Sequence, residues 1–405
     1  MNEDGIRFVL QLGRVLHRYG TPAHRLEEGL RVVCDRLGIA AEVFTTPTAI
    51  IMSFGDPIEL RTRMLRVESG ELDMGKLARV DALADEVAAR TVTAAEGVAK
   101  LEAIVASPRE FGRGLSTLMH GVTAGALAVF FGGGLPDVVI AAAIGFSLGL
   151  LAQYVQRSTD QARVFELVGA AFAAFVAGVV SSWWHAVSPP VVTVAALIVL
   201  LPGMSLTVAM TELATRNLIA GTARLMSAVI VLLELVVGVA LGEHLARAIA
   251  TVHQVTPVPL PEYAQWIALG AASIGVAIVV QAQVRAFGWI VAACAIGYLG
   301  SRVGTEWLGG SAAQMGQLGV MVGAFALGVL SNAYARLLDR PAQVVQVPAV
   351  LLLVPGSMGF RGMTSLLDKD TLSGVETVFA MFVVALAIVA GLLVANAVVS
   401  PRRSL

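Results

Sequence analysis

The sequence predicts an all-α polytopic membrane protein that is preceded by a small cytoplasmic α+β domain. Of its 405 residues, 57% are hydrophobic and only 14% are charged, with a mean hydropathy of +0.78, whereas soluble proteins carry about 25% charged residues. The charges gather at one end, since residues 1–113 hold 15 of the 28 Lys and Arg and 17 of the 29 Asp and Glu. Beyond them, apolar runs recur at intervals of about 20–35 residues, close to the length of a membrane span. We therefore expect a cytoplasmic domain over residues 1–113, and five-helix membrane repeats over residues 114–255 and 256–405.

The first 113 residues predict an ααβββαα module. The stretch EDGIRFVLQLGRVLHRYG has apolar residues at helical spacing, and Thr21 and Pro22 then suit the start of a second helix that stops at Gly38. Three β-rich runs follow, AAEVFTT, TAIIMSF and IELRTRMLRV, separated by turn residues. Two more helices are expected over Met74–Ala89 and Thr93–Val105. The module is interpreted as a regulatory or assembly domain.

Several function classes find no support in the sequence. No apolar export signal is visible at the N-terminus, so the first domain is expected in the cytoplasm. Cys34 and Cys294 fall in different domains, which predicts no disulfide, and Cys34 suits a core position. His17 and His24 are interpreted as ordinary surface histidines, because no further ligand completes a metal site. The net charge of −1 argues against nucleic-acid binding. Without a phosphate loop, nucleophile or cofactor pattern, we expect no enzyme, no cofactor and no metal.

Ten apolar runs predict ten membrane-spanning helices, over residues 116–133, 136–154, 165–183, 191–210, 222–242, 263–281, 286–302, 315–332, 343–360 and 374–398. Basic residues then set the orientation, because they favour cytoplasmic loops. With the first domain inside, the inner loops and the tail hold Arg157, Arg163, Arg216, Arg285, Arg336, Arg340, Arg402 and Arg403. The outer side holds only Arg247, Arg302, Arg361 and Lys369. Both termini are therefore expected in the cytoplasm.

The membrane part repeats itself. LLPGMSLTVAMTELATRNLIAG (200–221) lies 153 residues before LVPGSMGFRGMTSLLDKDTLSG (353–374), and AAIGF (142–146) is echoed by CAIGY (294–298). Each half has five predicted spans, and because five is odd, the second half must be inverted relative to the first. Inverted repeats with helices broken at corresponding places are typical of secondary transporters.

The Pro-Gly pairs, Pro202-Gly203 and Pro355-Gly356, predict where these helices break. Each lies about 17 Å into its span, close to the middle of a hydrocarbon core of about 30 Å. Proline removes a backbone donor and glycine loosens the turn, so backbone groups are left unpaired. At this depth such groups are tolerated only inside protein or beside a watery cavity. A half-helix that starts after Pro-Gly could hold a carboxylate, and freed carbonyls could hold an ammonium group.

Three stretches resemble the threonine/serine exporter family: RYGTPAHRLEEGLRVVCDRLG, LLPGMSLTVAMTELATRNLIAGTARL and LLLVPGSMGFRGMTSLL. The resemblance covers essentially the whole chain. It implies export of small hydrophilic amino acids driven by the proton gradient, and related systems with separate halves are linked to export of dicarboxylates such as succinate. The family more often has Asp at the position of Glu212, and the chain is short for a fused member.

Hydroxyl groups near the breaks are candidate substrate ligands: Ser205, Thr207, Thr211, Ser357 and Thr364. The alternative is that they bond carbonyls of their own helices, as Ser and Thr often do.

Charged residues follow both breaks. Glu212 and Arg216 are four residues apart, and they form either a solvated pair near the cytoplasmic surface or part of an inner vestibule. Arg361 and Asp368 in the second half form either an outer gate or a plain charged loop.

Glu234 lies about halfway through its predicted span, with no basic residue beside it on that helix. A carboxylate in the membrane is costly and is a functional candidate by default. It could carry the coupled proton, a role also considered for Glu212, or it could be a protonated residue bonded to a neighbouring helix.

The sequence therefore predicts a multi-pass exporter of threonine and serine in the cytoplasmic membrane, with protons and the lipid bilayer as its other partners. The alternatives are a dicarboxylate exporter and, in a different class, a channel or solute sensor. A homo-oligomer stays open.

Overall fold

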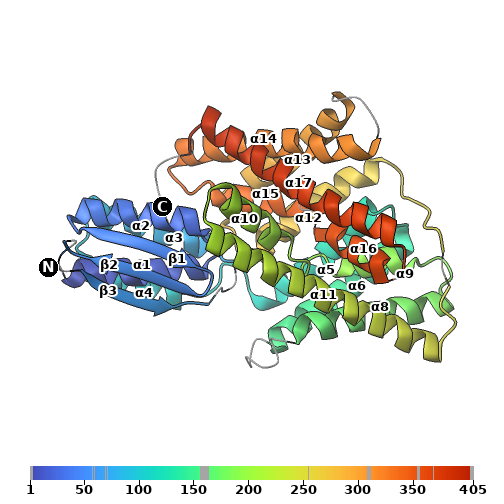
Figure 1. The fold of residues 1–405 in the computed structure, drawn as a ribbon. Coiled ribbons are helices and arrows are strands. Elements are labelled where there is room, and N and C mark those ends of the chain that lie inside the picture. Colours follow the sequence, from blue (N-terminus) through green and yellow to red (C-terminus); the bar gives the residue numbers. More distant parts are fainter. Residues whose placement is uncertain are drawn as a thin grey trace.

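The structure is a computed structural model that describes residues 3–56, 58, 60–68, 70, 72–155, 164–253, 255–307, 312–353, 356–367 and 369–401. The predicted site residues Pro355 and Asp368 lie outside the described residues, as do Arg157, Arg163, Arg402 and Arg403. An α+β region at the N-terminus packs against one end of a larger helical part (Figure 1).

The N-terminal region has the predicted ααβββαα order. Its elements are α1 (Glu3–Arg18), α2 (Ala23–Leu37), β1 (Ala41–Thr46), β2 (Ala49–Phe54), β3 (Arg61–Arg66), α3 (Met74–Ala88) and α4 (Ala94–Ala106). The three strands form an antiparallel sheet in the order β1-β2-β3. Alternation along β2 buries Ile50, Met52 and Phe54 on one face of the sheet, where they join the core of the helices.

The helical part follows from residue 113 onward. Its elements are α5 (Arg113–Phe130), α6 (Leu135–Val155), α8 (Phe165–Trp183), α9 (Pro189–Ala196), α10 (Gly203–Ala214), α11 (Leu218–Ile249), α12 (Tyr263–Val279), η1 (Val284–Ala286), α13 (Phe287–Trp307), α14 (Ala312–Leu338), α15 (Gln343–Leu353), α16 (Gly356–Leu367) and α17 (Thr371–Val398).

Within the described residues, seven helical segments are long and apolar enough to cross a membrane: α6, α8, α11, η1 with α13, α14, α15 with α16, and α17. The other three predicted spans fall on α5, on α9 with α10, and on α12, which is apolar but shorter. The break before Gly203 divides one of these spans, and Arg113 and His120 lower the hydropathy of α5. Ten crossings stay a prediction, whereas a mostly helical protein with seven candidate spans is observed.

The two halves pack in the same way. Helix α8 lies along α11 as α14 lies along α17, and α10 packs on α11 as α16 packs on α17. A Cβ added to Gly178 would lie 2.8 Å from the Cβ of Ala246, and one added to Gly328 would lie 2.7 Å from the Cβ of Ala395. The same small residues therefore allow the same close helix crossing in each half.

Helices α10 and α16 each contact the opposite half of the protein. Helix α10 of the first half contacts α17 of the second, and α16 of the second half contacts α11 of the first. Phe360 of α16 and Met381 of α17 are buried in the apolar core of the first half. These contacts bring the starts of α10 and α16 together.

Candidate functional site

The predicted break before Gly203 is present. Helix α9 ends at Ala196 and α10 begins at Gly203, with Pro202 at its N-cap position. Helix α15 ends at Leu353 and α16 begins at Gly356. The prediction of a half-helix that starts after Pro202 is therefore confirmed, whereas the second predicted break falls on residues 354–355, outside the described residues.

The two half-helices begin against each other. A Cβ added to Gly356 would lie 3.2 Å from the Cα of Gly203, 3.3 Å from its amide nitrogen and 3.2 Å from the Cβ of Leu201. Only glycine permits backbones to approach this closely. The N-terminal ends of helices carry partial positive charge, so two such ends meeting here favour an anionic group.

The ends of α10 and α16 match as well. Arg216 and Lys369 both adopt left-handed backbone conformations, with φ of 66° and 64°. The Asn217 amide donates to the carbonyl of Glu212 over 2.8 Å, and the Asp370 amide donates to the carbonyl of Ser365 over 3.0 Å. Each half-helix thus ends in the same hydrogen-bonded cap.

This cap overturns the predicted pairing of Glu212 with Arg216. Because α10 ends at Ala214, Arg216 leaves the helix and is exposed. Glu212 is instead fully buried, and its carboxylate accepts from Nε and Nη2 of Arg224 over 3.0 and 3.1 Å. The interpretation of a solvated pair of Glu212 and Arg216 is therefore wrong, whereas the inner vestibule stays a prediction.

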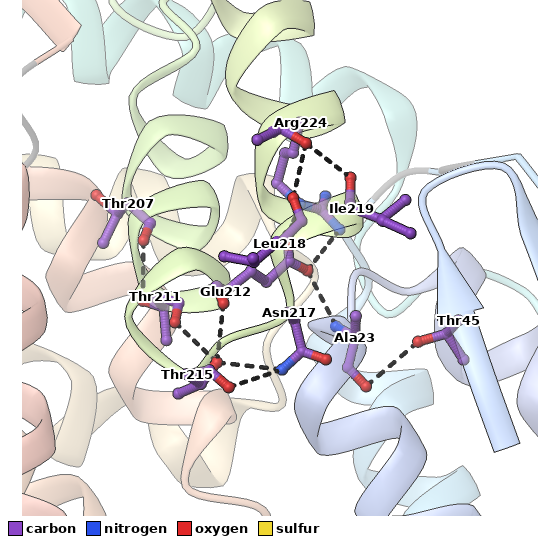
Figure 2. Close-up of polar contacts among 11 residues, drawn as sticks. Ala23, Thr45, Thr207, Thr211, Glu212, Thr215, Asn217, Leu218, Ile219 and Arg224 are labelled. Carbon is purple, nitrogen blue, oxygen red and sulfur yellow. Dashed lines mark hydrogen bonds and ion pairs between the residues drawn. The ribbon is translucent and has the colours of Figure 1, made fainter. Parts of the chain in front are cut away.

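Glu212 also joins the helical part to the N-terminal region (Figure 2). Its Oε1 accepts from the backbone amide of Ala23, the first residue of α2, over 3.0 Å. A carboxylate at a helix N-terminus satisfies a free amide and complements the helix dipole. Neither Arg224 nor Ala23 was predicted as a partner, since no local spacing links them to Glu212.

The threonine hydroxyls bond their own helices (Figure 2). Thr207 donates to the carbonyl of Gly203 over 3.2 Å, and Thr211 donates to that of Thr207 over 2.9 Å. Thr364 of α16 donates to the carbonyl of Phe360 over 2.8 Å. Ser205 and Ser357 are half-buried near the two breaks. A hydroxyl oxygen that donates to a carbonyl can still accept from a substrate.

An open cavity lies beside the break in α10. Its empty volume, including the open mouth, is about 1000 Å³. One wall comes from α10, with Met204, Thr207 and Thr211, and reaches the residue next to Gly203. Helices α15 and α17 supply further polar side chains, among them Gln343, Gln346 and Asn396. The remaining wall belongs to the N-terminal region and includes Gly20, Pro22, His24, Arg25 and Met74.

His17 and His24 are not surface histidines, which corrects the prediction. His17 is only 6% exposed, and burial, followed by the charge of Arg224, lowers its pKa. Burial lowers the pKa of His24 to about 4, with a smaller effect from Arg25. His17 is thus buried, and His24 is half-buried and lines the cavity. Among the described residues, no group of three or more His, Cys, Asp or Glu side chains could hold a metal ion.

Two predicted residues lie away from the cavity lining. Glu234 is half-buried near the middle of α11, and its carboxylate interacts with that of Glu166 on α8. Arg361 of α16 is exposed, and its guanidinium lies 4.7 Å from the ring centre of Phe131. The structure therefore brings Thr207 and Thr211 to the cavity and leaves these two charges elsewhere.

Two family models match the chain. The one described as "Putative threonine/serine exporter" matches residues 7–246, and the one described as "Threonine/Serine exporter, ThrE" matches residues 265–398. This chain belongs to the ThrE family of threonine/serine exporters. Both halves of ThrE are present in one chain, so the family that the sequence resembles is confirmed, and the protein is a multi-pass membrane protein of this exporter family.

This ThrE chain is also similar to fungal proteins. Pheromone-regulated membrane protein 10 of Eremothecium gossypii is 28% identical over 362 residues, which are 88% of this chain and 48% of the fungal protein. The protein of the same name from Saccharomyces cerevisiae is 29% identical over 371 residues, 89% of this chain and 47% of its own length. The chain spans about half the length of these relatives. No solved structure matches it at a significant level.

Proposed function

We propose that this protein is a secondary exporter of threonine, serine and similar small polar amino acids across the cytoplasmic membrane. The observation that carries the proposal is the contact between Gly203 and Gly356 beside the open cavity. The cavity lining offers hydroxyl and amide groups and the guanidinium of Arg25, which suit the polar groups of an amino acid, and a helix broken inside the helical part is typical of secondary transporters. Such a site binds and releases a solute, so we propose a carrier rather than an enzyme or a channel.

The proposed topology has ten crossings as two inverted repeats, divided near residue 255, with both termini in the cytoplasm. The matched helix caps at Arg216 and Lys369 support the repeat, as do the paired contacts of Gly178 and Gly328. In this topology the N-terminal region lies at the inner mouth of the cavity, and alternating access moves one set of helices against the other.

We further propose proton antiport, with Glu234 as the proton carrier. Its half-buried carboxylate lies midway along α11 and interacts with a second carboxylate, that of Glu166. Glu212 is less suited to the role, since Arg224 and Ala23 already hold its carboxylate. In vesicles with an imposed pH gradient, threonine flux should follow the gradient, and Glu234→Gln should uncouple it. Flux that ignores the gradient in the parent would refute the coupling.

A dicarboxylate such as succinate is the second candidate substrate, favoured by one observation. Arg25 lines the cavity and could bind a carboxylate. However, His24 beside it is neutral at neutral pH because burial lowers its pKa to about 4, so the described lining offers one permanent positive charge. One such charge fits the single carboxylate of an amino acid better than two carboxylates.

Reconstitution into proteoliposomes tests the proposed function. Counterflow of labelled threonine and serine is expected to saturate and to be competed by either amino acid, whereas succinate should compete weakly. Vesicles without protein and vesicles with a purified, heat-unfolded sample serve as controls. Saturable succinate flux with no threonine flux would replace the first substrate class by the second.

A further inference from the structure

We propose that the N-terminal α+β region is part of the transport site and that Arg25 of α2 binds the carboxylate of the substrate. This inference rests on the proposed function and assigns a substrate ligand that lies outside the membrane helices. The helical part alone would leave the cavity without one wall, because Gly20, Pro22, His24 and Arg25 complete it.

The charges of the cavity single out Arg25. Among the described residues that line it, Arg25 carries the only formal charge at neutral pH, and the other polar groups are hydroxyls, amides and the imidazole of His24. Arg25 has a nearby carboxylate in Glu28, but the two are 3.9 Å apart and the Glu28 side chain is 63% exposed. Such a surface pair contributes little and leaves the guanidinium able to bind another carboxylate.

Glu212 positions Arg25. The Glu212 carboxylate holds the amide of Ala23, two residues before Arg25, and is itself fixed by Arg224. Just after the first turn, Glu27 ties α2 to β1, because Thr45 donates its amide and hydroxyl to the Glu27 carboxylate over 2.7 and 3.0 Å. The start of α2 is thus clamped from two directions, which fixes where Arg25 enters the cavity.

The same contact links Arg25 to the break. Helix α10 starts at Gly203, against Gly356, and carries Glu212 in its last turn. Its 12 residues form one rigid rod of about 18 Å. A movement of α10 during transport would therefore act on the start of α2, two residues before Arg25.

The test compares parent protein, Arg25→Gln, Arg25→Lys and Arg31→Gln in proteoliposomes. Arg31 lies on the same helix, is exposed and does not line the cavity, so it is the matched control. Losing a charge-assisted hydrogen bond should raise the threonine KM about 10- to 100-fold in Arg25→Gln, with the maximal rate nearly unchanged. Arg25→Lys should lie between, and Arg31→Gln should match the parent.

A competitor without a carboxylate shows whether Arg25 binds the substrate carboxylate or only packs in the cavity wall. Serinamide should compete less well than serine in the parent, and Arg25→Gln should lose that preference. Glu212→Gln should raise the threonine KM by a smaller factor and add nothing in the Arg25→Gln background, because both changes act on one contact. Additive effects of the two substitutions would overturn the positioning role.

The inference and the proposed function fail separately. If the parent transports threonine and Arg25→Gln has the parent KM and the parent preference for serine, the inference is overturned while the function stands. If the parent transports no amino acid, the proposed function fails, and thermal stabilisation of the purified parent by succinate then decides the role of Arg25. Stabilisation that Arg25→Gln abolishes supports it, and stabilisation that is absent or unchanged in the variant refutes it.

Discussion

Replacing Gly356 by alanine should impair transport more than stability. The added Cβ would lie 3.2 Å from the Cα of Gly203 and 3.3 Å from its nitrogen, whereas carbon atoms in good contact are about 3.5–4.0 Å apart. The neighbours are backbone atoms of α10, which cannot rotate away as a flexible side chain would. The starts of α10 and α16 must therefore separate by about 0.5 Å.

The energetic cost of this separation is moderate. Overpacking a close contact costs about 1–3 kcal/mol, and alanine returns up to about 1 kcal/mol through its higher helix propensity. We expect Gly356→Ala to lower the free energy of unfolding by about 0–3 kcal/mol, so the protein should still fold. Transport should fall at least about 10-fold, because small displacements at a positioned site cost large factors in rate.

Threonine counterflow in proteoliposomes measures the loss, and thermal unfolding in detergent measures the stability. Gly288→Ala in α13 and Gly270→Ala in α12 are matched controls, since an added Cβ at either position meets no atom within 4 Å. Both controls should transport like the parent. Parent-like transport by Gly356→Ala would show that the close approach of the two half-helices is not required.

Three further outcomes are expected. Gly242→Ala and Gly391→Ala should each destabilise the protein by about 3 kcal/mol, because an added Cβ would overlap the backbone carbonyl of a helix in the same half. Melting temperatures equal to the parent's would contradict this packing. The folded protein lowers the pKa of His24 to about 4, so neutral His24 adds up to about 3 kcal/mol to the free energy of unfolding above pH 6.5, and this is lost as the pH falls through 4. His24→Gln should therefore weaken the loss of stability in unfolding curves measured at low pH. An unchanged curve would show that His24 does not cause this loss. Burial, followed by the charge of Asp35, raises the pKa of Cys34 to about 12. Maleimide should therefore label Cys34 only after denaturation. Labelling of Cys34 in the folded protein would show that the N-terminal core opens.

Local sequence patterns were enough to locate the break before Gly203 and the N-terminal module. The order of the N-terminal elements and the start of α10 depend on short-range effects, namely helix caps, turn residues and the missing amide of proline. The burial of Cys34 likewise followed from its apolar neighbours on an amphipathic helix. Such features were predicted because the residues that cause them are adjacent in the chain.

The partners of the charged residues could not be predicted in this way. The four-residue spacing predicted that Glu212 pairs with Arg216. The cap at Arg216 ends the helix, and Glu212 pairs with Arg224 instead. His17 and His24 were interpreted as exposed because nothing nearby in the sequence reveals that His17 is buried or that His24 is half-buried in the cavity lining.

The sequence alone determined that this is a membrane protein with two halves that each carry a Pro-Gly motif and with a helix break at Pro202, because hydropathy, periodicity and proline act over short stretches of chain. Only the tertiary structure decided that Gly203 meets Gly356, that Glu212 holds the first turn of α2, and that Arg25 faces the cavity. These contacts join residues that are more than 150 positions apart, and they depend on how whole helices pack, for which no local pattern is sufficient.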